Sequence, residues 1–157
     1  MAPCARNVIP LKPRRSSEDL PVPLERLGVA VQELDDLGRC IRQIIDDPGS
    51  SALEWSVACM PLMLRLPGAR RSLADLAEIR VGRWPDTDWA VRLRAARDEV
   101  ERGLLDISMS MNALIHGETS AIDAAVNFSF EGTELAEAVH ELCWLITSQY
   151  PEAVDGI

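Results

Sequence analysis

Glu137, His140 and Cys143 are the residues whose types and spacing could do chemistry, because each follows the last by three positions along a predicted helix. Side chains at this spacing share one helix face, so a carboxylate, an imidazole and a thiol could converge on a metal ion. Glu-x-x-His is half of the ligand set of di-iron helical bundles. The second half is missing, because Ala113 stands three residues before His116, the other histidine. A metal-binding or small-ligand-binding bundle is therefore the alternative prediction.

Signatures of catalysis are scarce in the rest of the chain. The sequence contains no G-x-S-x-G elbow, no phosphate-binding loop and no G-x-G-x-x-G turn. The residues after His116 are Gly-Glu-Thr and those after His140 are Glu-Leu-Cys. Neither run has the basic residue and glycine that commonly follow a phosphotransfer histidine. The sequence therefore leans away from an enzyme, and we expect no cofactor.

Tryptophan and arginine form a second set of candidates, because both are enriched at the energetic centres of protein interfaces. One tryptophan precedes Pro85 in a predicted loop, and another lies on the flank of the last predicted helix. Four methionines, at positions 60, 63, 109 and 111, could line a deformable groove. The interaction candidates are Trp84, Trp144, Arg70, Arg71, Arg80 and Arg83.

Charge is distributed unevenly along the chain. The net charge is −9, yet residues 65–97 hold eight arginines against four acids, whereas residues 98–157 hold one arginine against twelve acids. Such polarity could pair internally or steer a charged partner. The overall negative charge repels phosphate, which disfavours nucleic acid as a general partner.

The elements that must position these residues are predicted to be helices. Apolar residues recur every three or four positions, and we find no long strand-like alternation. We expect an all-α bundle of four to five helices in one domain over 21–157, preceded by a flexible tail over 1–20. The expected helices cover 24–47, 51–66, 72–80 and 88–116, of which the last is the longest, and a kink or break is expected at Pro61. The remaining region is expected to bend at 128–132 before a final helix over 133–149. One continuous helix is the alternative for this region.

Location is predicted from what the sequence lacks. No apolar run approaches the ~18 to 20 residues of a membrane span, and the first residues lack a secretory signal. The four cysteines have no paired spacing, which favours reduced thiols. These features predict a cytoplasmic protein with no membrane partner.

Together these observations predict a non-enzymatic helical bundle that acts as an adaptor or regulator by docking on a protein partner or on a second copy of itself.

Overall fold

The computed structural model describes residues 24–77 and 87–155, and every element in these ranges is a helix. Four long helices, α2 (Leu24–Asp46), α3 (Ala52–Leu76), α4 (Thr87–Ile115) and α5 (Ala121–Gln149), are followed by a single turn, α6 (Glu152–Asp155). The prediction of an all-α bundle is confirmed. The predicted tail lies outside the described residues.

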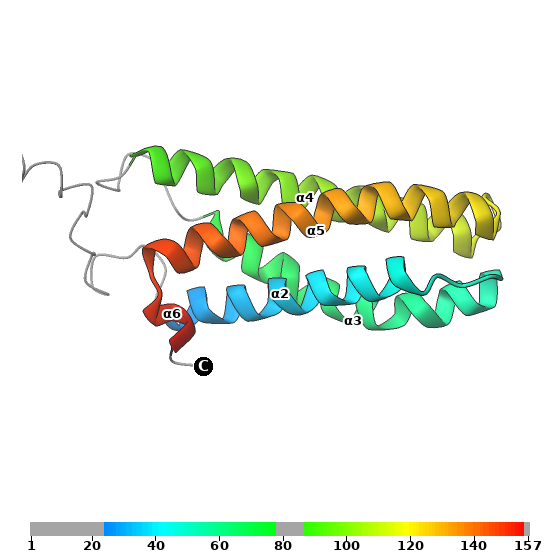
Figure 1. Ribbon diagram of the computed structural model, residues 1–157, viewed down its shortest axis with the longest axis horizontal. Coiled ribbons are helices and arrows are strands. Elements are labelled where there is room, and N and C mark those ends of the chain that lie inside the picture. The colour runs from blue at the N-terminus through cyan, green and yellow to red at the C-terminus, as the bar shows by residue number, and fades with distance from the viewer. Residues whose placement is uncertain (1–23, 78–86, 156–157) are drawn as a thin grey trace, which may run out of the picture.

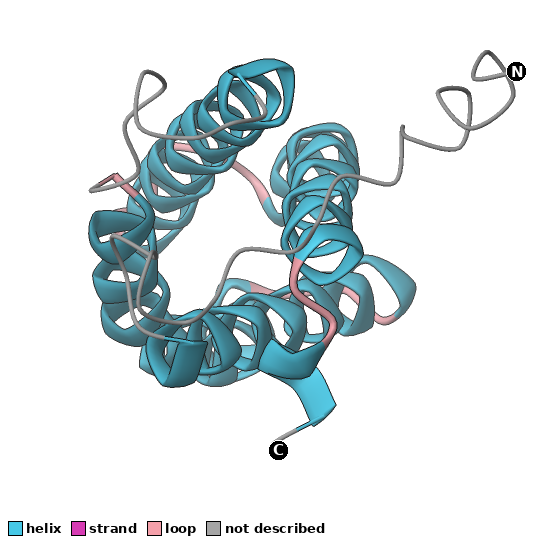
Figure 2. Cartoon of the chain, turned by 90° about the vertical axis from the view of Figure 1, so that its left-hand side faces the viewer, coloured by secondary structure: helices cyan, strands magenta, loops and turns pink. Residues whose placement is uncertain are grey.

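The four long helices run alternately up and down around a common centre (Figures 1 and 2). Contacts are extensive between α2 and α3, between α2 and α5, and between α4 and α5, and they are sparser between α3 and α4. The turns 47–51 and 116–120 lie at the same end of the bundle, on the right in Figure 1, and we call this the turn end.

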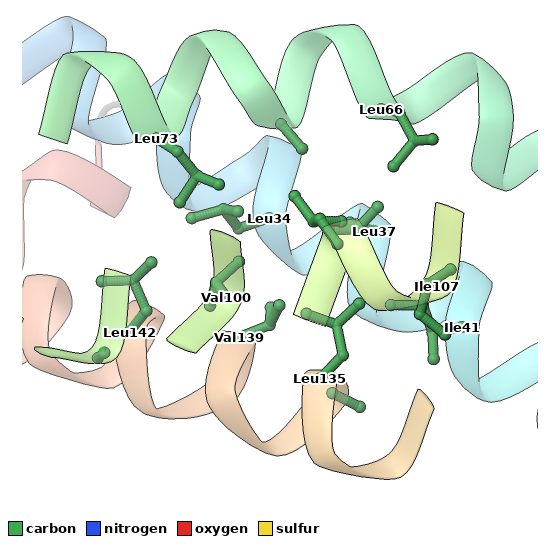
Figure 3. Packing of buried hydrophobic residues seen from close by; sticks show 14 of the residues in the cluster. Leu34, Leu37, Ile41, Leu66, Leu73, Val100, Ile107, Leu135, Val139 and Leu142 are labelled. Atoms are coloured by element: carbon green, nitrogen blue, oxygen red, sulfur yellow. The ribbon is translucent and has the colours of Figure 1, made fainter. Parts of the chain in front are cut away.

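The core is built from one apolar stripe of each long helix. Leucine, isoleucine and valine side chains from all four helices converge on the bundle centre (Figure 3). In α4, the apolar residues that recur every three or four positions are all buried, namely Trp89, Leu93, Ala96, Val100, Leu104, Ile107, Met111 and Leu114.

The gap predicted between the helical segments 51–66 and 72–80 was wrong. Helix α3 runs unbroken through Pro61 and Pro67 as far as Leu76, which excludes the predicted break at Pro61. Both proline rings lie on the exposed side, where they remove one backbone hydrogen bond each. Buried residues on the opposite side, from Trp55 to Leu76, hold the helix together by packing across the core.

Helix α5 is one continuous helix of 29 residues, so the division predicted at 128–132 was wrong and the alternative prediction of a continuous helix is confirmed. Phe128 and Gly132 lie in register with the buried residues that follow them, so the whole helix packs on the core. Helix α4 also has 29 residues, so the helix predicted as longest shares that length with α5.

None of the helices in the described ranges combines the length and the apolar character needed to cross a membrane.

Candidate interaction surface

Helix α3 has apolar side chains on two opposite faces in its first half. One face is in the core, where Trp55, Cys59 and Leu62 are at most 2% exposed. The other face points to solvent and carries Leu53, Val57, Met60 and Leu64, with exposed fractions of 75%, 61%, 58% and 79%. We call these four residues the α3 outer stripe. A helix that is apolar all round is usually buried on all sides, and here only one side is covered.

Local sequence explains why the helix begins where it does. The Glu54 N–H donates to Ser51 Oγ at 3.2 Å, and the Glu54 carboxylate accepts from the Ser50 N–H at 2.7 Å. These are the two hydrogen bonds of an N-terminal capping box, except that the Glu54 carboxylate accepts from the N–H of Ser50 in place of the N–H of the N-cap residue, Ser51. Hydrogen bonds from the Ser50 side chain and backbone lower the pKa of Glu54. Glu54 is the only charged residue between Ala52 and Leu64.

The exposed apolar residues are concentrated at the turn end of the bundle. Of fourteen large apolar side chains that the described residues expose, only Val29, Val91 and Trp144 lie in the other half. The remaining eleven are in the first halves of α3 and α5 and the second half of α4. Outside α3 they are Leu105, Met109, Ile115, Ile122, Val126 and Phe130.

Charges of opposite sign flank the α3 outer stripe. Asp47 is exposed beside its N-terminal end, where it lines a hollow with Leu53 and Val57. Arg71 is exposed beyond its C-terminal end and shares a hollow with Leu64, whereas Arg70 is turned toward Asp98 and Glu101 of α4. Neither Asp47 nor Arg71 forms an ion pair with a described residue, whereas Arg65 pairs with Asp36 at 3.3 Å.

Two surface hollows adjoin the stripe. One, of about 490 Å³, is lined by Leu53, Val57 and the turn residues Asp47, Pro48 and Gly49, with Glu54 and Ala58. The other, of about 700 Å³, lies between α2 and α3. Its lining includes Leu64, Pro61 and Pro67, together with the charged residues Glu33, Asp36, Arg39, Arg65 and Arg71.

The interaction candidates predicted from the sequence are not all brought together. Arg70 and Arg71 lie on α3, as described above. Trp144 is half exposed on α5, where the Arg92 guanidinium lies 5.7 Å from its ring centre and also pairs with Glu141 at 3.0 Å. It lies in the half of α5 away from the turn end. Trp84, Arg80 and Arg83 lie outside the described residues.

The candidate metal ligands diverge. Glu137 and His140 are exposed and line a hollow of about 410 Å³ between α2 and α5. Cys143 points to another part of α2, with its Sγ 3.9 Å from the Val31 carbonyl oxygen. Burial, followed by the charge of Asp35, raises the Cys143 pKa to about 12, which disfavours the thiolate that binds metals. Within 24–77 and 87–155, no three His, Cys, Asp or Glu side chains are grouped to hold a metal ion.

The α3 outer stripe was missed at the sequence level, although a signal for it exists. Of this segment, only the methionines at positions 60 and 63 were predicted to line a deformable groove, and they are 58% and 45% exposed. The overlooked signal is the lack of any polar face between Ala52 and Leu64. A helix at the surface of an isolated bundle needs such a face.

Comparisons of the chain with protein-family models, with curated proteins and with solved structures find no match. Function is therefore inferred from the residues and their geometry.

Proposed function

We propose that this protein is a non-enzymatic interaction module, an adaptor or regulator that docks on a protein through the turn end of its bundle. The observation that carries the proposal is the α3 outer stripe, four large apolar side chains that are each more than half exposed. Contiguous apolar surface of this kind is unfavourable in water and commonly marks an interaction site. Methionines at positions 60, 63 and 109 add side chains that adapt to different partners.

The alternative, a bundle that binds a metal or small ligand, has less support. The hollow beside Glu137 and His140 is open to solvent, and although Asp46 and Glu141 also line it, no three of the described His, Cys, Asp or Glu side chains are grouped to hold a metal ion. The thiols of Cys59 and Cys143 have pKa values raised to about 11 and about 12 by burial. Both are therefore poor nucleophiles at neutral pH.

A cytoplasmic location is part of the same proposal. Cys40, Cys59 and Cys143 are all free thiols in the described part of the chain. Unpaired cysteines are typical of reducing compartments.

The test is purification of tagged full-length protein from its native host, side by side with the variant Leu53→Gln/Leu64→Gln. Both substitutions are at exposed positions, so the fold should persist, as circular dichroism can verify. We expect a companion protein, or an untagged copy of the chain, to be retained in stoichiometric amount by the wild type and lost from the variant. Bait without any companion, or companions retained equally by both proteins, would contradict the proposal.

A further inference from the structure

We infer that the protein that docks on the α3 outer stripe is a second copy of this chain, packed antiparallel along α3. This inference rests on the proposed function and names the partner. Leu53, Val57, Met60 and Leu64 are separated by four, three and four positions. This is the d-a-d-a spacing of a coiled-coil seam. A seam of this kind is completed by another helix with the same spacing, and a two-fold axis supplies one.

Charge sets the direction of the second helix. The acidic Asp47 lies beside the N-terminal end of the stripe, and the basic Arg71 lies beyond its C-terminal end. A parallel copy would place acid against acid and base against base. An antiparallel copy places each basic end over an acidic end, with the two-fold axis between Val57 and Met60.

The surface relief agrees with this arrangement. With the axis between Val57 and Met60, Leu64 of one copy faces Leu53 of the other. Leu64 is 79% exposed, and the hollow of about 490 Å³ lined by Leu53 and Val57 could receive it. Arg71 follows Leu64 by seven residues on the same face of α3. In the antiparallel pair it extends toward Asp47, which lines that hollow.

Helix α5 is a poorer site for a second copy, although Ile122, Val126 and Phe130 are exposed on it. It carries no arginine or lysine, and its acids Glu134, Glu137 and Glu141 are exposed. Helix α5 has no basic end that could lie over an acidic end of a second copy. Helix α3 therefore offers the self-complementary surface that a two-fold contact requires.

The size of the contact predicts its strength. From Asp47 to Arg71, a helix-like stretch at 1.5 Å per residue and about 11 Å wide gives a footprint of roughly 400 Å² on each copy. The total of roughly 800 Å² is below the roughly 1,000 Å² of stable specific interfaces and within the range of weak, transient contacts. We therefore expect a reversible dimer with a dissociation constant on the order of micromolar.

The first experiment is sedimentation equilibrium of the full chain across about 2 to 500 μM, a range that brackets a micromolar dimer. We expect a mass that rises from monomer to dimer. Met60→Glu places one negative charge from each copy beside the two-fold axis. It should weaken the dimer at least about thirtyfold. The matched control is Val91→Glu on α4, because Val91 is 49% exposed against 58% for Met60 and lies away from the turn end. This control should leave the dimer unchanged.

The second experiment tests the direction of packing. Arg71→Asp and Asp47→Arg should each weaken the dimer roughly threefold to tenfold. The double variant in one chain should restore it, because each new aspartate then faces a new arginine. In a parallel dimer the double variant would still oppose like charges, so a failure to recover overturns the antiparallel arrangement.

A monomer throughout the concentration range, or a dimer that Met60→Glu leaves intact, overturns the inference. The proposed function fails separately, because it depends on whether any companion in the native host is lost with the Leu53→Gln/Leu64→Gln variant. Suppose that the chain stays monomeric, and that a different protein copurifies in stoichiometric amount with the wild type but not with that variant. The proposed function would then stand, and the second copy would be excluded.

Discussion

Gly103 of α4 lies directly against Leu135 of α5, at a point where the two helices have no room for another carbon atom. A Cβ at position 103 would lie 2.8 Å from Leu135 Cδ1 and 3.2 Å from Leu135 Cβ. Leu135 is only 1% exposed, so its side chain has little freedom to give way. The glycine therefore allows the close approach of α4 and α5, the pair of helices with the most extensive contact.

Gly103→Ala is expected to destabilise the protein despite the better helix propensity of alanine. The propensity gain is about 0.5 to 1 kcal/mol, whereas overpacking a core costs about 1 to 3 kcal/mol, so a net loss of about 1 kcal/mol is expected. Gly38→Ala on α2 is the matched control, because its Cβ would meet Val139 Cγ1 at an ordinary 3.5 Å. The control should gain stability. Urea unfolding of both variants measures the difference, and equal shifts would contradict the prediction.

Leu62 and Leu64 lie two residues apart on opposite sides of α3, and the same substitution should have very different effects on them. Leu62 is fully buried, whereas Leu64 is 79% exposed. Leu62→Ala should cost about 2 to 5 kcal/mol because it leaves a cavity in the core. Leu64→Ala should change the free energy of unfolding by no more than about 0.5 kcal/mol. Urea unfolding at a concentration where the protein is monomeric provides the measurement. A large cost at position 64 would mean that the outer stripe already stabilises the monomer.

The buried stripe of α4 could be read from the sequence because its periodicity is unambiguous. From Trp89 to Leu114 the apolar positions step by three and four without interruption, and each one is buried. The continuity of α3 and α5 could not be read in the same way. Proline and glycine are local signals for a break, and packing across the bundle outweighed them at Pro61, Pro67 and Gly132.

The α3 outer stripe illustrates a second limit of prediction from sequence. Periodicity identifies an apolar face, but α3 has two of them, and either could have been the one in the core. The choice between the faces depends on contacts with α2 and α4 that are distant in the sequence. Of the interaction candidates in the described residues, Arg71 borders the stripe, whereas Arg70 is turned toward α4 and Trp144 lies in the other half of the bundle.

Cys59 and Cys143 should resist alkylation in the folded protein. Burial raises the pKa of Cys59 to about 11, and burial with a contribution from Asp35 raises the pKa of Cys143 to about 12. Since the thiolate is the reactive form, iodoacetamide at about pH 7.5 should modify both residues at least ~100 times more slowly than in the unfolded chain, whose thiol pKa is about 8.5. Peptide mass spectrometry of native and urea-unfolded samples measures the two rates. Rapid labelling of either cysteine in the native sample would show that it is more accessible than the structure indicates.

The capping arrangement at the start of α3 should make stability depend on pH in a predictable direction. Ser50 lowers the pKa of Glu54 through side-chain and backbone hydrogen bonds. A carboxyl whose pKa is lower in the folded state stabilises the protein above its unfolded pKa of about 4.3, and this contribution is lost as the pH falls through the folded pKa. The difference in unfolding free energy between wild type and Glu54→Gln should therefore be largest near neutral pH and shrink below about pH 4.

The serine at the cap provides the companion measurement. Ser51→Ala removes the acceptor for the Glu54 N–H and should cost about 1 kcal/mol. Ser56→Ala is the matched control, because Ser56 lies one turn into α3 and its hydroxyl only donates to the Ala52 carbonyl oxygen. The control should shift stability by no more than about 0.5 kcal/mol. Equal losses for the two serine variants, or a Glu54→Gln difference that grows as the pH falls, would show that the cap does not anchor the helix that carries the outer stripe.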